Sequence, residues 1–165
     1  MIIILDGAKG AGKSSVGEIL IQKIKNAIIL AFDTERKNLT NQERNRAETS
    51  NETFERILEK GEALILSGDT VIIDCGLTEN RVSELEKLAT KTNSKLYKFL
   101  LRADYETLLE RVKERDSKNN KDTNVERFDE VYKIINNKEF SDFRVINTDT
   151  LRPSEIANII LGDIS

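Results

Sequence analysis

The feature that most constrains this chain is a glycine-rich segment that lies between a short apolar run and an amphipathic stretch. Ile2–Leu5 is the apolar run, which is too short to span a membrane and is typical of a buried strand. Gly7–Ser14 follows it and matches G-x-x-x-x-G-K-[ST], the P-loop or Walker A motif. Glycines let successive N–H groups point into one concavity, and a helix beginning near Lys13 adds the positive end of its dipole. The segment is therefore predicted to bind the phosphates of a nucleoside triphosphate.

Two side chains in this motif have specific expected partners. Lys13 is predicted to reach the β- and γ-phosphates, and the Ser14 hydroxyl is predicted to ligate Mg²⁺. A glycine-rich turn without a ligand is the alternative, but a strand before it and a helix after it both favour the P-loop. ATP and Mg²⁺ are thus the expected cofactors. The residues expected to contact ATP are Gly7, Ala8, Lys9, Gly10, Ala11, Gly12, Lys13, Ser14 and Ser15.

Composition narrows the class of protein further. A length of 165 residues fits one domain, and a hydrophobic content of 38% with 33% charged residues is typical of a soluble globular protein. The net charge of −3 gives no overall field that favours nucleic acid or an anionic membrane, although a local basic groove stays open. Cys75 is the single cysteine, which excludes an internal disulfide. There is no histidine, which excludes a histidine as general base, as activator of a nucleophile or as metal ligand. Neither a signal peptide nor a long apolar run is evident, so a cytoplasmic location is expected.

Apolar runs alternate with helical periodicity along the whole chain. The five predicted strands cover residues 2–5, 27–32, 70–74, 96–101 and 143–147. The predicted helices cover residues 13–25, 54–66, stretches from 78 and from 104, 125–136 and a last helix beginning at Pro153. Asp104 is the predicted N-cap of its helix, and Thr150 or Ser154 that of the last one. This α/β alternation predicts right-handed βαβ units, a parallel sheet with helices on both faces, and a ligand at the carboxyl ends of the strands.

Carboxylates and arginines are predicted to meet at that edge. Asp33 closes the second predicted strand and Asp74 the third, while Arg111 and Arg115 lie one helical turn apart before a highly charged segment. One carboxylate can accept a proton from a substrate hydroxyl, and another can hold Mg²⁺ together with Ser14. The arginines can neutralise charge on a transferred phosphoryl group. Lys13, Asp33, Arg111 and Arg115 are therefore the candidate catalytic residues, and Ser14 and Asp74 the candidate metal ligands.

Each of these residues also has a structural alternative. Asp33 could end its strand in an Asx-turn, and Asp74 could be a solvated strand end. The two arginines could form surface ion pairs with Glu110 and Glu114 instead of binding phosphate. These alternatives stay open at the level of sequence.

The pattern resembles the small P-loop kinases of nucleotide-kinase-like fold, the group that contains polynucleotide 5′-kinase domains, gluconate kinase-like enzymes and antibiotic phosphotransferase-like enzymes. The resemblance covers nearly the whole chain. The segments that carry it are the P-loop, Asp33–Arg36, Val71–Asp74 followed by Arg81, Leu109–Arg115, and the unit from Val145 to Leu161. It implies a P-loop NTPase three-layer sandwich with sheet order 2-3-1-4-5, in a single kinase domain over residues 1–165. It also implies a small lid at about 114–127 and an acceptor-binding region at about 34–60.

The same resemblance implies roles for particular residues. Asp33 would be the base for the acceptor hydroxyl, and Arg36 would help to hold the acceptor. Arg115, together with Arg111, would contact the transferred phosphate. Whether Arg36, Arg44 and Arg46 contact substrate stays open.

The function expected from these residues is that of a Mg·ATP-dependent kinase, an ATP-dependent phosphotransferase. Its acceptor would be a hydroxyl of a small metabolite, a nucleoside or a nucleic-acid 5′ end. The alternatives are a nucleoside or nucleoside-monophosphate kinase, and a partner-controlled P-loop NTPase without acceptor phosphorylation. The GTPase motif N-K-x-D is not met, because Asn120–Thr123 ends in threonine. The acceptor, the choice between ATP and GTP and the oligomeric state stay open.

Overall fold

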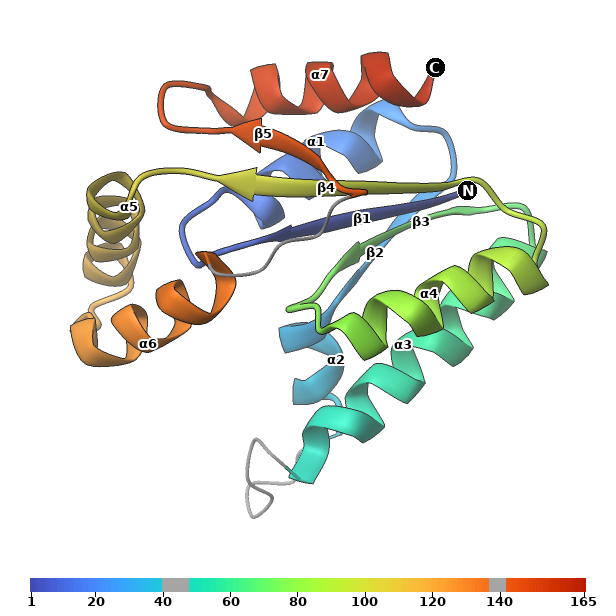
Figure 1. Ribbon diagram of the computed structural model, residues 1–165, viewed down its shortest axis with the longest axis horizontal. Helices are drawn as coiled ribbons and strands as arrows, with labels where there is room; N and C mark the ends of the chain where they lie inside the picture. The colour runs from blue at the N-terminus through green and yellow to red at the C-terminus, as the bar shows by residue number, and fades with distance from the viewer. Residues whose placement is uncertain (40–47, 137–141) are drawn as a thin grey trace.

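The computed structural model describes residues 1–39, 48–136 and 142–165, which contain five strands and seven helices (Figure 1). The strands are β1 (Ile2–Gly7), β2 (Ala27–Ala31), β3 (Thr70–Asp74), β4 (Leu96–Arg102) and β5 (Arg144–Asn147). The helices are α1 (Lys13–Lys23), α2 (Phe32–Lys37), α3 (Glu48–Leu66), α4 (Glu79–Lys91), α5 (Tyr105–Lys118), α6 (Val125–Asn136) and α7 (Pro153–Ile164). Among the described residues, no helix combines the length and apolar character that crossing a membrane requires.

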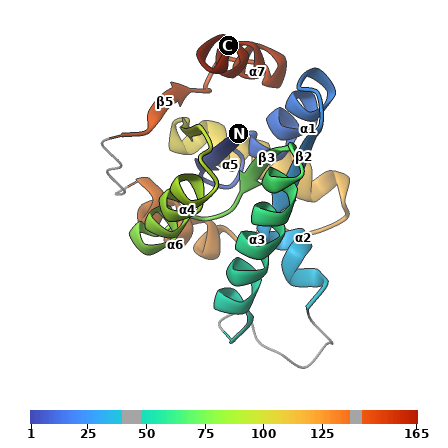
Figure 2. The ribbon, with the colours of Figure 1, turned by 90° about the vertical axis from the view of Figure 1, so that its right-hand side faces the viewer.

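The strands form one parallel sheet in the order β2-β3-β1-β4-β5, which confirms the predicted order. Helices α1 and α7 cover one face and α3 and α4 the other, so the molecule has three layers (Figures 1 and 2). Helices α5 and α6 lie beyond the carboxyl ends of the strands (Figure 1). The register of β1 places Leu5 opposite Asp74 and Gly7 opposite Leu101, which brings the ends of three strands together at this edge.

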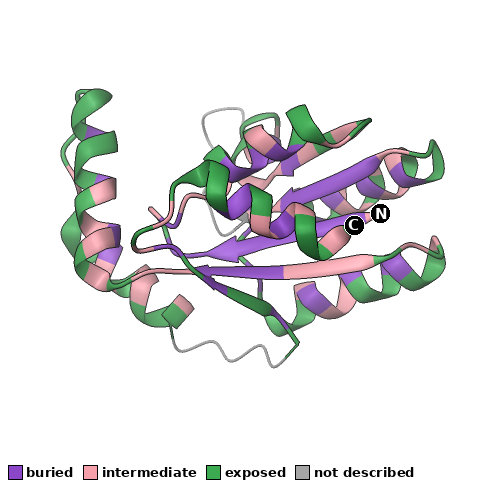
Figure 3. Cartoon of the chain, turned by 90° about the horizontal axis from the view of Figure 1, so that it is seen from above, coloured by how far each residue is buried: buried purple, intermediate pink, exposed green. Residues whose placement is uncertain are grey.

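Strand β1 is buried along its whole length, because it lies at the centre of the sheet (Figure 3). Successive side chains of a strand point to opposite faces, and β1 divides its apolar residues accordingly. Ile2 and Ile4 pack in the cluster with α3 and α4, whereas Ile3 and Leu5 pack in the cluster with α1 and α7. Each such side chain stabilises the fold by about 1.5–3 kcal/mol. The apolar run of β1 thus packs into both hydrophobic clusters, and this packing fixes where the P-loop begins.

The structure corrects the predicted end of the second strand. Strand β2 ends at Ala31, and α2 begins at the next residue, so Asp33 lies in the first turn of a helix. Asp33 and Glu35 both occupy that turn, where a negative charge is favourable near the positive end of the helix dipole. Apolar periodicity could not find this six-residue helix because it is less than two turns long.

Of the two predicted helix caps, the position of Asp104 is confirmed and the cap of the last helix is wrong. Asp104 occupies the N-cap position of α5, but its side chain makes no capping hydrogen bond; its backbone N–H donates to Asp149 Oδ1 at 2.7 Å. The N-cap of α7 is Arg152, whose N–H donates to Glu155 Oε2 at 2.7 Å, in place of Thr150 or Ser154. Pro153 does begin this helix, as its fixed φ favours.

Helix α2 is held against α3 by a buried carboxylate. Glu35 Oε2 accepts from Lys60 Nζ at 2.6 Å and from Arg56 Nε at 3.1 Å, and only 8% of the Glu35 side chain is exposed. Hydrogen bonds from charged donors to a carboxylate are about twice as strong as neutral ones. Because Asp33 and Arg36 flank Glu35 on the same short helix, this contact helps to fix their position.

We predict that Glu35→Gln lowers the free energy of unfolding by about 1–3 kcal/mol, because it leaves two cations without their shared carboxylate. Urea unfolding followed by circular dichroism measures the change. Glu84→Gln is the matched control, since Glu84 pairs with Lys87 at the surface of α4. This control is expected to change stability by less than about 0.5 kcal/mol. Equal losses in the two variants would contradict the proposed contribution of Glu35.

Candidate active site

The loop between β1 and α1 has a backbone that requires glycine. Gly7, Gly10 and Gly12 have φ values of 151°, 90° and 96°. A Cβ on Gly7 would lie 2.4 Å from the Leu101 carbonyl oxygen, and one on Gly10 would lie 2.7 Å from that of Leu108. The loop therefore packs directly on the backbones of β4 and α5. This is the close-packed curl that a phosphate-binding loop needs.

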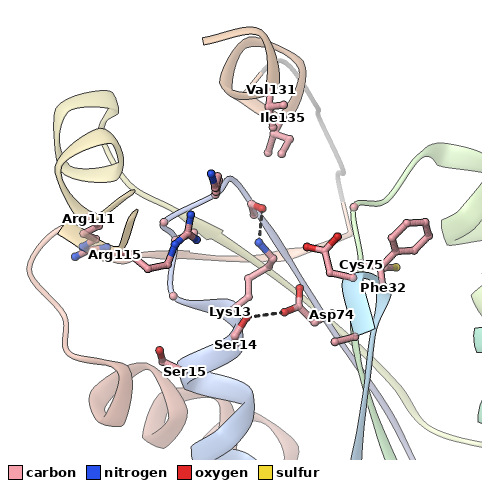
Figure 4. Close-up of a pocket in the computed structure, with 18 of the residues that line it drawn as sticks. Lys13, Ser14, Ser15, Phe32, Asp74, Cys75, Arg111, Arg115, Val131 and Ile135 are labelled. Atoms are coloured by element: carbon pink, nitrogen blue, oxygen red, sulfur yellow. Dashed lines mark hydrogen bonds between the residues drawn. The ribbon is translucent and has the colours of Figure 1, made fainter. Parts of the chain in front are cut away.

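Lys13 and Ser14 project from the first turn of α1 (Figure 4). Lys13 Nζ donates to the carbonyl oxygens of Gly7 at 2.8 Å and Ala8 at 3.3 Å, so the ammonium group lies over its own loop. Ser14 Oγ donates to Asp74 Oδ2 at 3.2 Å, which joins the P-loop to the end of β3. A hydroxyl and a carboxylate from adjacent elements form an oxygen pair of the kind that Mg²⁺ prefers.

The electrostatics of Asp74 agree with a cation site. Burial raises the pKa of its carboxyl above the ordinary value of 3.8, and the nearby Asp33 acts in the same direction. The charge of Lys13 and the hydrogen bond from Ser14 lower this pKa without cancelling the effect of burial. A partly buried carboxylate of this kind is stabilised when a cation binds beside it. The donor set therefore fits a hard divalent ion.

These groups line a cavity of about 780 Å³ at the carboxyl edge of the sheet. The P-loop forms its floor, and further walls come from the start of α2, the residues after β3, and helices α5, α6 and α7. The lining residues outside the P-loop include Phe32, Asp33, Thr34, Asp74, Cys75, Gly76, Arg111, Arg115, Asn124, Arg127, Phe128, Val131, Ile135, Leu151, Pro153 and Ile156. The structure thus brings Lys13, Ser14, Asp33, Asp74, Arg111 and Arg115 to one cavity.

The two α5 arginines have different partners. Arg111 Nη2 donates to the carbonyl oxygens of Thr148 at 2.6 Å and Asp149 at 3.1 Å, and so ties α5 to the loop after β5. Arg115 donates to Asp116 Oδ1 from Nη2 at 2.8 Å and from Nε at 3.2 Å. These contacts differ from the surface pairs with Glu110 and Glu114 that the sequence left open.

Asp33 and Arg36 form an ion pair, with 3.5 Å between Asp33 Oδ1 and Arg36 Nη2. The Asp33 side chain is 76% exposed and lines the cavity, whereas that of Arg36 is only 16% exposed and is not among the lining residues. The structure therefore brings the predicted base to the cavity, but not the predicted acceptor clamp. Arg44 and Arg46 lie outside the described residues.

One face of α6, which the sequence did not predict to be part of the site, lines the cavity. Arg127, Phe128, Val131 and Ile135 line the cavity, and Figure 4 shows Val131 and Ile135 across from the P-loop, pointing toward it. Their spacing of three or four residues marks one side of a helix. That pattern is visible in the sequence, but an apolar helix face is usually part of a core, so its position over the P-loop was not evident.

A glycine-dependent P-loop at the edge of a 2-3-1-4-5 parallel sheet, with arginines on a helix beyond that edge, defines the P-loop kinase-like fold. The chain belongs to the family whose model, AAA_33, is described as an AAA domain and matches residues 2–132. No curated protein sequence matches the chain at a significant level.

Solved structures, two kinases among them, share this architecture over nearly the whole chain. A gluconokinase from Sinorhizobium meliloti 1021 has a TM-score of 0.68 at 18% identity, covering 97% of this chain and 89% of its own. The APS kinase CysC of Mycobacterium tuberculosis, in complex with AMPPNP and APS, gives 0.69 at 15% identity, covering 99% and 96%. The tunicamycin resistance protein of Deinococcus radiodurans gives 0.72 at 18% identity, covering 99% and 95%. At these identities the similarity establishes the fold.

We predict that Asp74→Asn raises the free energy of unfolding of the ligand-free protein at neutral pH. A carboxyl whose pKa is raised by folding destabilises the folded state once it is ionised, so the variant lacks this cost. The gain is expected to shrink as the pH falls toward 3.8, where the carboxyl becomes protonated in both states. Urea unfolding of the wild type and of Asp74→Asn between pH 7 and pH 3.8 measures the difference in the free energy of unfolding. Asp122→Asn, which changes an exposed carboxylate, is the control. A gain that is independent of pH would contradict the electrostatic explanation.

Proposed function

We propose that this protein is a Mg·ATP-dependent kinase that transfers the γ-phosphate of ATP to a hydroxyl group of a small-molecule or nucleotide-type acceptor. The observation that carries the proposal is the convergence of the P-loop, the Ser14–Asp74 pair and the exposed carboxylate of Asp33 on one cavity. The gluconokinase and APS kinase folds support it. Binding of the triphosphate is assigned to residues 7–15, with loop N–H groups on its oxygens.

On the nucleotide side, Lys13 exchanges the carbonyl oxygens of Gly7 and Ala8 for the β- and γ-phosphates. Ser14 and Asp74 are the groups that would hold Mg²⁺, which supplies charge neutralisation at the phosphates when bound. Arg115 and Arg111 lie on the cavity wall, where a guanidinium can contact the transferred phosphoryl group.

On the acceptor side, Asp33 accepts the proton of the attacking hydroxyl. The acceptor oxygen forms a bond to the γ-phosphorus while the bond to the bridging oxygen of ADP breaks, and the proton remains on Asp33. The large exposed fraction of the Asp33 side chain is consistent with this role, because a base must be accessible to its substrate. Phe32 and, from α6, Val131 and Ile135 line the same cavity. Arg36 supports Asp33 through their ion pair.

The test is the release of ADP from Mg·ATP across a panel of acceptors, comprising sugars, sugar acids, nucleosides, nucleoside monophosphates, 5′-hydroxyl oligonucleotides and aminoglycoside-like alcohols. We expect one class of acceptor to raise turnover at least about tenfold. Lys13→Ala is expected to abolish turnover, because the P-loop lysine stabilises the phosphates. Asp33→Asn is expected to lower acceptor-dependent turnover by about 10²–10⁴, the usual contribution of a general base.

The matched control for Asp33→Asn is Asp122→Asn, an exposed carboxylate outside the cavity lining, which is expected to leave turnover unchanged. A flat panel with slow, Lys13-dependent hydrolysis would overturn the kinase proposal in favour of an NTPase without an acceptor. Full acceptor-dependent activity in Asp33→Asn would overturn the assignment of the base alone.

A further inference from the structure

Asp116, near the end of α5, contacts side chains from α5, from the P-loop and from the connection between α5 and α6. Its Oδ1 accepts from Arg115, and its Oδ2 accepts from Thr123 Oγ1 at 3.2 Å and lies 3.7 Å from Lys9 Nζ. Lys9 belongs to the P-loop, and Thr123 to the connection between α5 and α6. Only 12% of the Asp116 side chain is exposed. Both of its carboxylate oxygens are therefore engaged in a largely buried position.

The backbone of Asp116 stabilises the same connection. Its carbonyl oxygen accepts from the N–H groups of Asn119 at 3.0 Å and Lys121 at 2.9 Å, which end α5 and turn the chain toward α6. The pKa of the Asp116 carboxyl is lowered, chiefly because Arg115 donates to it, and Lys9 and Thr123 act in the same direction against burial. The carboxylate is thus held in its charged form beside the phosphate-binding loop.

The contact with Asp116 occupies one particular edge of the Arg115 guanidinium. Nε and Nη2, which both point to Asp116 Oδ1, form the edge that makes paired hydrogen bonds to a phosphate or carboxylate. Arg115 nevertheless lines the cavity, and 49% of its side chain is exposed. Figure 4 shows its position beside the P-loop. A triphosphate in the cavity would compete with Asp116 for this edge.

We propose that Asp116 is a positioning residue that withholds Arg115 from the phosphate site until a nucleoside triphosphate competes for it. The inference rests on the proposed function, since it requires the P-loop to bind a nucleotide. When Arg115 moves to the phosphates, Lys9 and Thr123 remain as partners of the Asp116 carboxylate, so its charge stays compensated. The free energy of breaking the Arg115–Asp116 contact opposes nucleotide binding, and removing the Asp116 charge removes this opposition.

The experiment is a double-mutant cycle on the affinity for Mg·AMPPNP, measured by calorimetry with the full chain. Asp116→Asn keeps an oxygen that can accept from Thr123 but lacks the charge that holds Arg115. We expect it to bind Mg·AMPPNP about 3- to 10-fold more tightly than the wild type, since one charged hydrogen-bonded contact at a half-exposed arginine is no longer broken. Arg115→Ala is expected to bind several-fold more weakly. The double variant is expected to match Arg115→Ala, because without Arg115 there is nothing to withhold.

One control separates this effect from a general loss of negative charge, and a second checks folding. Glu114→Gln removes a negative charge from an exposed position next to Arg115, and is expected to change the affinity less than twofold. Thermal unfolding checks that each variant is folded. Should Asp116→Asn unfold, Asp116→Ser takes its place in the cycle, because its hydroxyl still offers an acceptor to Thr123.

The outcomes distinguish this inference from the proposed function. An unchanged or weaker affinity in Asp116→Asn would overturn the inference. A tightening that persists in the Arg115→Ala background would overturn it as well, because the effect would then be a simple loss of negative charge. Failure of the wild type to bind Mg·AMPPNP in a Lys13-dependent way would instead overturn the proposed function.

Discussion

The close contact between the P-loop and the backbones of β4 and α5 is the constraint on which the rest of the site depends. Gly7 approaches the Leu101 carbonyl and Gly10 approaches the Leu108 carbonyl at distances that leave no room for a Cβ. This contact is possible only because β1 lies between β3 and β4 with its full length buried. The centre of the hydrophobic core and the floor of the cavity are therefore parts of one packing arrangement. Since interiors are close-packed, the position of the loop is set by the same contacts that stabilise the domain.

Two charged side chains in and beside the P-loop lie in positions that do not fully compensate their charge in the ligand-free protein. Asp74 is held where burial disfavours its charge, while Lys13 lies on carbonyl oxygens of its own loop. Each group has a partner in the ligand-free protein, and the proposed function requires a metal–nucleotide complex to replace that partner. Ionisable groups with perturbed pKa values cluster at functional sites for this reason. Under the proposed function, a phosphate–cation pair would satisfy both groups.

Polar contacts join several of the segments around the cavity to one another. Glu35 joins α2 to α3, Arg111 joins α5 to the loop after β5, and Asp116 joins α5 to the P-loop. Arg81 adds a further contact, since its guanidinium lies over the rings of Phe32 and Phe54 and donates to the Gly76 carbonyl oxygen. Such contacts have discrete alternatives, which is what allows an element to move between two arrangements. The two apolar clusters on either side of the sheet provide the rigid support.

The sequence by itself determined the P-loop, the five strands and their parallel direction, because apolar runs, helical periodicity and glycine spacing are local signals. The order of the strands was implied by the resemblance to small P-loop kinases. It also determined that Asp74 ends β3. Only the tertiary structure decided that Asp33 lies on a helix, that Arg36 pairs with it, and that Arg115 contacts Asp116. The face of α6 that lines the cavity was likewise decided by packing. A side chain's partner depends on which distant segments meet it, and that information appears only when the sheet brings its edges together.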